Sequence, residues 1–429
     1  MIDRRNRNGL FILVSLLVLG VLFVLTWINL GYIRSNPGGG QSFLVHWISL
    51  RGFLLEGVSP YSQEANQLTQ REVYGRLARP GEDQLQFLSP VYVTVVFFPF
   101  ALIPDVHLAR ALWMTLLQAA LLLIAYFSAR LANWRPGLIL WVVYLLFVVF
   151  WFHSFQPLIE GDPIILVALM LTGVLVAVRN ETDELAGLLL ALATILFWAV
   201  LLPFMVIFVS ALVHQRRTIV GWTIGTMVLL GATGALLQPD WILQNIWQIV
   251  AYMNNPPPGN IRAVLMELLP GMGDRLGYAA LAFFAALVIV EWVRLRKTEF
   301  RGFLWLICLT ITVGLWLGPV TDAGNFVLAL PALPLVFAIL EERWRRSGKA
   351  ISFILMLILF AGLWGMYISN TGWVFARYFD LALFFPLPLF LLIVLYWVRW
   401  WAVRPAMWFD MIYQRENPGS DGIHSKRSP

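Results

Sequence analysis

The chain has 429 residues, of which 60% are hydrophobic and 13% are charged, and its mean hydropathy is +0.76. Soluble globular domains carry about 25% charged residues, so these values exclude that class and predict an integral membrane protein. The net charge of +6 lies in loops, without a basic stripe interleaved with aromatic residues, so no nucleic-acid partner is expected. The lone cysteine, Cys308, excludes an intrachain disulfide.

Residues 1–33 are predicted to form an N-terminal signal-anchor helix. Arg4, Arg5 and Arg7 precede an apolar run that ends at residue 33, and no small-residue cleavage site interrupts this run. Positive charge before a retained apolar segment indicates an N-terminus in the cytoplasm.

Residues 34–106 are predicted to be a first extracytoplasmic loop with surface helices. Within 41–56, apolar side chains such as Phe43 and Trp47 recur at helical spacing, with charged and polar side chains between them. Such an amphipathic helix lies in the membrane interface and does not cross the bilayer. A wholly polar helix and loop are expected at 62–84.

The apolar segment 89–104 is predicted to form a third surface helix. It contains three prolines, and a crossing here would place the arginines of loop 130–135 outside and the acids of loop 160–162 inside. That arrangement would reverse the usual excess of positive charge in cytoplasmic loops. A segment that lies along the surface keeps those arginines in the cytoplasm.

The rest of the chain divides into a membrane core at 107–236, a second extracytoplasmic loop at 237–275, C-terminal membrane helices at 276–400 and a cytoplasmic, partly disordered tail at 401–429. A crossing needs about 20 residues, so the long run 186–212 is expected to form two short spans that divide near Trp198. The expected fold class is an all-α polytopic membrane protein with about twelve transmembrane helices. Both termini are expected in the cytoplasm, and the protein is expected to be integral to the plasma membrane.

Polar residues near the outer ends of predicted helices are the candidates for chemistry. Asp162 precedes a proline at a helix start, where its alternative role is to cap free backbone N–H groups. Arg110 lies one turn into the span that begins at His107, where it either meets a ligand or extends to the interface. Asp322 stands at another helix end, and Arg262 follows the prolines of the second loop.

The order of these elements resembles that of GT-C glycosyltransferases. The phrases "GGGQSFLVHWISLRGFLLEGVSPYS", "PFALIP" and "ARALWMTLLQAALLL" are similar to the first blocks of glycosyltransferase family 87, the polyprenyl-phosphate-sugar-dependent mannosyltransferases. The phrases "AGLLLALATILFWAVLLP", "PDWILQNIWQIVAY" and "TDAGNFVLALPAL" resemble later blocks, and the similarity runs through roughly residues 9–340.

The resemblance implies transfer of a hexose, with mannose favoured, from a polyprenyl-phosphate sugar to a lipid or glycan acceptor at the outer face. A carboxylate would deprotonate the acceptor hydroxyl, and cations would stabilise the departing phosphate. Asp162 is the first candidate for the catalytic base, and Glu56 and Asp322 are the second choices. The candidate substrate-binding residues are Gln41, Ser42, His46, Arg110, Trp198 and Arg262, and the two arginines among them are candidate phosphate partners. Membrane lipids are further expected partners.

The chain departs from the family pattern at three places. Members have an acid before a phenylalanine in the first loop, where this chain has Ser42 before Phe43. Asp162 stands where glutamine is typical, and residues 196–198 read Leu-Phe-Trp where a Lys-Pro-Gln type of turn is typical. Two interpretations stay open: a divergent subgroup that has moved its acid to Asp162, or a scaffold that has lost the reaction.

The rival function is a non-catalytic lipid-sugar binding scaffold or a transporter. Twelve spans suit a transporter, but the two halves of this chain do not resemble each other as transporter repeats do. Glu56 is more simply a solvated residue on the polar face of its helix. His46 and His107 have no second metal ligand at a suitable spacing, so no metal-binding residues are predicted. A divalent cation as a cofactor is left as an open alternative.

Overall fold

The computed structural model describes residues 4–36, 38–79, 82–254, 261–317, 323–370 and 386–403. The regular structure in these ranges is helical, without a strand, which confirms the all-α class. In chain order the helices are α1 (Arg4–Ser35), α2 (Gln41–Glu56), α3 (Gln63–Tyr74), η1 (Val91–Val93), α4 (Thr94–Ala101), α5 (Val106–Leu131), α6 (Leu138–Phe150), α7 (Phe152–Glu160), α8 (Ile164–Arg179), α9 (Asp183–Leu192), η2 (Ala193–Leu196), α10 (Phe197–Val213), α11 (Arg217–Leu237), α12 (Trp241–Asn254), α13 (Ile261–Leu268), α14 (Gly273–Leu295), α15 (Phe300–Leu317), η3 (Ala323–Ala329), α16 (Ala332–Asn370) and α18 (Pro386–Val403).

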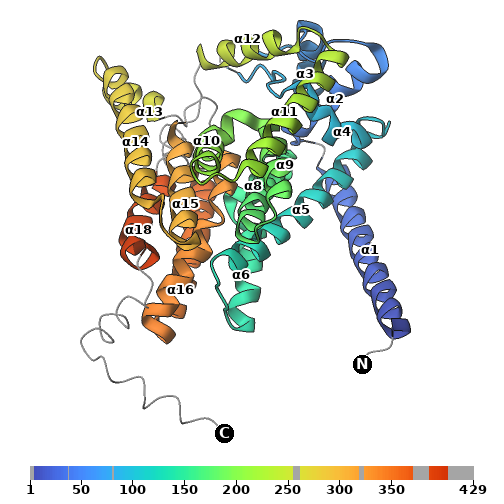
Figure 1. Cartoon of the computed structure of the whole chain (residues 1–429). Coiled ribbons are helices and arrows are strands. Elements are labelled where there is room, and N and C mark those ends of the chain that lie inside the picture. The colour runs from blue at the N-terminus through green and yellow to red at the C-terminus, as the bar shows by residue number, and fades with distance from the viewer. Residues whose placement is uncertain are drawn as a thin grey trace, which may run out of the picture.

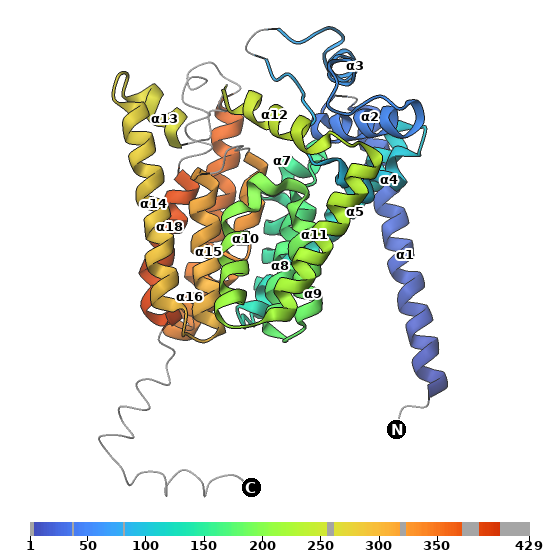
Figure 2. The same ribbon diagram turned by 45° about the horizontal axis from the view of Figure 1, so that its top comes forward.

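The helices form a bundle with two distinct ends (Figure 1, Figure 2). The short helices α2, α3, α4, α7 and α12 lie at one end, which we call the α2–α3 face. The connections at 179–183, 213–217 and 295–300 lie at the opposite end, which we call the Arg216 face. The beginning of α1 also points toward that opposite end.

Eight helical segments within the described residues are long and apolar enough to cross a membrane, and the bent pair α6 and α7 would make a ninth. These segments are Leu13–Ser35, Val106–Leu131, Asp183–Val213, Arg217–Leu237, Gly273–Leu295, Phe300–Leu317, Gly324–Gly365 and Pro386–Val403. Helix α8 is also apolar but shorter. The chain is therefore a polytopic membrane protein, although this number is below the twelve expected.

The segment Asp183–Val213 folds back on itself. Asp183 at its start forms an ion pair with Arg216, just past its end. Midway, in η2, the Thr194 carbonyl oxygen accepts a hydrogen bond of 3.0 Å from the Tyr92 hydroxyl of η1. The chain therefore runs from the Arg216 face toward the α2–α3 face and returns, with its turn at residues 193–196, close to the division expected near Trp198.

The segment Gly324–Gly365 folds back in the same way. At one end Glu341 accepts a hydrogen bond of 2.8 Å from the Trp134 indole, and Arg345, at φ 44°, breaks the helix beyond it. Trp364, after the break, donates to the Phe150 carbonyl at the other end of α6. Each of these two segments therefore passes through the bundle twice, although by length and composition the described residues hold eight spans, or nine with the bent pair, and not the twelve expected.

Helix α1 is joined to the bundle by polar contacts with α5. The Asn29 amide donates to Thr115 Oγ1 and to Gln118 Oε1, each at 3.0 Å, and Thr26 Oγ1 lies 3.0 Å from the same Thr115 hydroxyl. Polar groups in a bilayer hold helices together because lipid offers them no other partner. Ile33 also packs on Ala111 and Met114 of α5, whereas most large apolar side chains between Leu13 and Ile28 are exposed.

The segment 89–104 lies on the α2–α3 face and does not cross the bundle. Helix α4 has only eight residues, against about 20 for a crossing. Arg34 at the end of α1 lies 3.9 Å from Asp105 before α5, so the loop returns to the end that it left. Two side chains of α2 tie α4 down, because the Trp47 indole and Arg51 donate to the carbonyls of residues 100 and 101.

We predict that Gly187→Leu lowers the melting temperature of the protein in detergent by several degrees. A Cβ on Gly187 would lie 2.6 Å from the Ile219 carbonyl oxygen of α11, so any side chain here pushes the two helices apart, and overpacking costs about 1–3 kcal/mol. Gly225→Leu is the matched control, because its Cβ would have no atom within 4 Å. Equal melting temperatures for the two variants would contradict this packing.

Candidate functional site

Two of the residues selected from the sequence, Gln41 and Arg110, lie close together on the α2–α3 face, where they contact residues 159–160, and Asp162 follows two residues later in the chain. There the beginning of α2, the first turns of α5 and the connection between α7 and α8 are in contact. We call this place the α7–α8 corner and define it as residues 39–41, Arg110 and residues 159–162.

Two glycines lay the backbone directly over the Arg110 guanidinium. Gly40 has φ +80°, and a Cβ on it would lie 2.4 Å from Arg110 Nε. A Cβ on Gly39, which has φ +81°, would lie 3.4 Å from Arg110 Nη2 and 3.8 Å from Glu160 Oε1. Only glycine is free of strain at these φ values and leaves room for the guanidinium, which explains the glycines before α2.

Arg110 is buried, with 3% of its surface exposed. Its Nη2 donates a hydrogen bond of 3.0 Å to the Ile159 carbonyl, and its Nε has no partner among the described residues. A buried charge needs a compensating charge nearby, and the Glu160 carboxylate lies on the same side of Gly39. Arg110 is thus enclosed by protein and holds the corner together.

Glu160 caps α2 from a distant part of the chain. Its Oε2 accepts a hydrogen bond of 2.8 Å from the backbone N–H of Gln41, 119 residues away. Gly40, the residue before α2, offers no side-chain cap, and a carboxylate at a helix N-terminus is favourable. Glu160 is not among the residues selected from the sequence, because its partner is 119 residues away in the chain. The available signal was its position directly before Gly161, at the end of a helix.

Asp162 caps α8, as its alternative interpretation proposed. Its Oδ1 accepts a hydrogen bond of 2.8 Å from the Ile164 N–H, and the residue is half-buried. The preceding residue, Gly161, is also held in place, because its carbonyl accepts a hydrogen bond of 2.8 Å from the Trp113 indole. A Cβ on Gly161 would lie 2.6 Å from Cβ of Phe43. The positions of Glu160 and Asp162 are therefore fixed by packing under α2.

His46 lies beneath α2 and not on its polar surface. It is 7% exposed, its ring stacks on Phe97 at 4.8 Å, and its Nε2 lies 2.9 Å from Ser89 Oγ. Its Nδ1 lies 2.7 Å from the carbonyl of Ser42. Burial lowers the pKa of His46 to about 4, so its ring is neutral at neutral pH.

The other candidates lie apart from the corner. Glu56 is exposed at the opposite end of α2, and Trp198 is buried at the start of α10. Arg262 is on α13, which lies far from α2 in both views (Figure 1, Figure 2), and its Nε donates to Asp274 at 2.6 Å. Arg262 therefore does not converge with Arg110 and Asp162, and Asp322 lies outside the described residues.

The charges of the corner do not form a metal site. Within the described ranges, no three His, Cys, Asp or Glu side chains are grouped as ligands of a metal ion. The corner instead combines two half-buried carboxylates, at residues 160 and 162, with one enclosed guanidinium. Such a group of charges can bind polar hydroxyl groups and accept a proton.

Comparison with known proteins confirms the family resemblance. Residues 87–319, more than half of the chain, match the model of glycosyltransferase family 87. No curated protein matches the chain. The matched range includes Arg110, Glu160 and Asp162, while the beginning of α2 precedes it.

We predict that acid destabilises the protein through His46. The unfolded chain binds a proton near pH 6.5 and the folded chain only near pH 4, so stability is full above pH 6.5 and falls by about 3 kcal/mol as the pH decreases to 4. Melting temperatures measured at pH 7.5 and pH 5 should differ less in His46→Gln than in the wild type. His107→Gln, at the start of α5, is the control and should keep the wild-type pH dependence; a wild-type dependence in His46→Gln would contradict the assignment.

Proposed function

The chain belongs to glycosyltransferase family 87, and we propose that it transfers a hexose, with mannose favoured, from a polyprenyl-phosphate sugar to a lipid or glycan acceptor. The main support is the α7–α8 corner, where Glu160 lies next to the buried Arg110 and caps α2, and where Asp162, two residues further on, caps α8. We place the reaction on the α2–α3 face, at the outer side of the plasma membrane, with both termini in the cytoplasm.

The polyprenyl chain of the donor has an apolar route to the corner along α1. Leu13, Leu17 and Phe23 are between 63% and 69% exposed, a surface that suits contact with lipid chains. At the end of α1, the Arg34 side chain is 61% exposed and lies 3.9 Å from Asp105, directly before α5. A guanidinium is a good phosphate ligand, so we propose Arg34 as the phosphate partner.

Arg110 and Arg262 are less suited to that role. Arg110 is enclosed by residues 39–40 and donates to the Ile159 carbonyl, so it holds the chain directly before Glu160 in place. Arg262 is paired with Asp274 on a distant helix. Arg34 is an exposed arginine directly next to the start of α5, at the same end as the corner.

Asp162 is our proposed base. It takes the proton from the acceptor hydroxyl, and the oxygen then forms a bond with the anomeric carbon of the donor sugar. The bond between that carbon and the phosphate oxygen breaks, and the phosphate leaves with the electron pair next to Arg34. Positioned carboxylates and cations lower such barriers because they are already oriented toward the charges that develop.

Glu160 compensates for the acid that the family has in the first loop. The chain has Ser42 at that position, and Glu160 Oε2 lies 2.8 Å from the N–H of the preceding residue, Gln41. A carboxylate thus stands at the beginning of α2 although the first loop does not supply it. This favours a divergent active enzyme over a scaffold that has lost the reaction.

We predict that Asp162→Asn lowers the transfer rate by at least about 100-fold, the usual contribution of a general base. Asparagine also caps helices, so the melting temperature and the elution volume should not change. Glu56→Gln, which neutralises an exposed acid at the other end of α2, is the control and should transfer at the wild-type rate. Wild-type activity in Asp162→Asn would remove Asp162 as the base.

We also predict that Glu160→Gln reduces transfer and that adding Ser42→Asp restores part of it. Glutamine keeps an oxygen for the Gln41 N–H but removes the charge, and an aspartate at 42 returns a carboxylate to the same end of α2. Initial rates of the single and double variants measure this compensation. A double variant as slow as Glu160→Gln, with both proteins folded, would show that the two positions are not equivalent.

A further inference from the structure

A cavity of about 580 Å³ opens on the Arg216 face, at the end of the bundle opposite to the α7–α8 corner. It lies between the connections α8–α9, α10–α11 and α14–α15. Its volume is in the range of small-molecule binding sites, about 300–1,000 Å³. The proposed transferase reaction leaves this cavity without a role.

The rim of the cavity is cationic. Among the described residues, Arg179 donates only to neutral groups, the carbonyls of Arg130 and Leu131 and the Asn133 amide oxygen, and it forms no ion pair. Arg296 forms no ion pair with any residue that the structure describes. Both side chains are on exposed residues, so their charge is accessible to a ligand.

The other charges of the rim leave an excess of positive charge. Arg216 is neutralised by its ion pair with Asp183, and Glu181 is an exposed acid without an ion pair among the described residues. His214 also lines the cavity, and its Nδ1 lies 2.7 Å from the carbonyl oxygen of Ser210.

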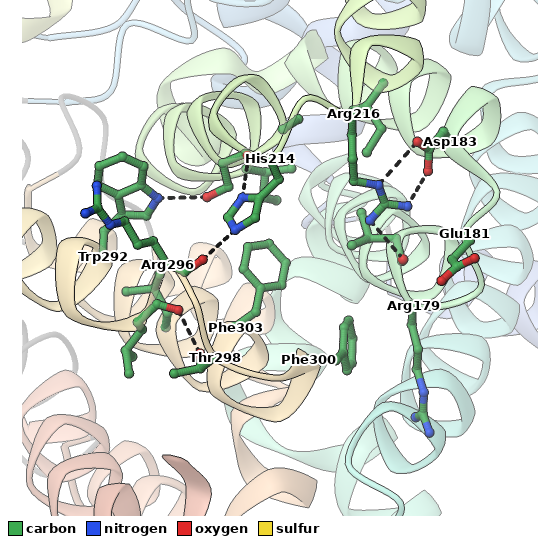
Figure 3. Close-up of a pocket in the computed structure, with 17 residues that line it drawn as sticks. Arg179, Glu181, Asp183, His214, Arg216, Trp292, Arg296, Thr298, Phe300 and Phe303 are labelled. Carbon is green, nitrogen blue, oxygen red and sulfur yellow. Dashed lines mark hydrogen bonds and ion pairs between the residues drawn. The ribbon is translucent and has the colours of Figure 1, made fainter. Parts of the chain in front are cut away.

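The interior of the cavity is apolar. Figure 3 shows Phe303 and Phe300 between the group of His214 and Arg296 on one side and the group of Arg216, Asp183 and Arg179 on the other. Further apolar lining residues are Ile207, Ala211, Ile219, Leu295 and Leu306. A cationic rim around an apolar interior, at one end of a membrane bundle, complements an amphiphile with an anionic headgroup.

We propose that this cavity binds the phosphate headgroup of an anionic phospholipid from the adjoining leaflet, with part of an acyl chain against Phe303 and Ile207. Arg296 and Arg179 stand on opposite sides of the cavity (Figure 3), so their two positive charges would each attract the anionic headgroup to the rim, and Arg296 has no ion pair among the described residues to compete with it. Basic pockets between membrane helices are suited to anionic headgroups, which the helices meet at the surface of the leaflet. The lipid would join three connections of the bundle and stabilise their arrangement.

The test is native mass spectrometry and melting of the full chain in detergent, with added phosphatidylglycerol or phosphatidylcholine of identical acyl chains. Phosphatidylglycerol should bind one molecule per chain more tightly than phosphatidylcholine and raise the melting temperature. Arg179→Gln with Arg296→Gln should weaken its binding roughly 25-fold, because one arginine near an anionic surface contributes about fivefold. The single variants give the same test, at about fivefold each, if the double variant does not fold.

The control is Arg217→Gln, which removes an equal charge from the same face but does not line the cavity. It should bind phosphatidylglycerol as the wild type does. Equal binding of both lipids, or an equal loss in Arg217→Gln, would overturn the proposal. Inorganic phosphate at millimolar concentration is a further arm: if it alone gives the same stabilisation through Arg179 and Arg296, the cavity is a site for free phosphate compounds and the lipid proposal is wrong.

Discussion

The burial of one guanidinium under two glycines is the constraint on which the α2–α3 face depends. Arg110 is 3% exposed, and a charge in such a place is stable only with hydrogen bonds and an opposite charge around it. The Ile159 carbonyl supplies the hydrogen bond, and Glu160 supplies the charge while it caps α2. One arginine thereby connects the first loop, α5 and the connection between α7 and α8, and these three parts carry the proposed site.

The bilayer explains why the rest of the chain takes this form. Two long apolar segments fold back on themselves: the first starts and ends at the ion pair of Asp183 with Arg216, and the second turns at the break near Arg345. Charged side chains are costly inside the bilayer, so the turns rich in charge lie at the Arg216 face. At the opposite end, the turn of the first segment at residues 193–196 is apolar apart from Thr194, whose carbonyl oxygen accepts a hydrogen bond from Tyr92.

The sequence predicts elements more reliably than their contacts. The amphipathic helix expected at 41–56 is α2 (Gln41–Glu56), and the division expected near Trp198 lies at residues 193–196, because apolar periodicity and segment length are local properties. The partners of charged residues are not local. Glu160 meets a residue 119 positions away, and Arg262 has Asp274 as its partner instead of joining Arg110.

His46 and Asp162 show the same limit at single residues. In the helix pattern His46 is a polar residue among apolar ones, yet the fold buries it against Phe97. From the sequence, Asp162 could be either a helix cap or a catalytic base. In the structure it accepts a hydrogen bond from the Ile164 N–H, as a cap does. Its proposed chemistry depends on the second carboxylate, Glu160, and on Arg34, whose place beside Asp105 follows from the packing of α1 on α5.

Transfer by the purified full chain in lipid nanodiscs tests the central claim most directly. Radiolabelled polyprenyl-phosphate mannose and polyprenyl-phosphate glucose would each be supplied with a mixed pool of lipid and glycan acceptors. We expect label from the mannose donor in a product, with less or none from the glucose donor. Saturable binding of a donor without any transfer of label, by protein that is folded, would contradict an active enzyme and identify a lipid-sugar binding scaffold.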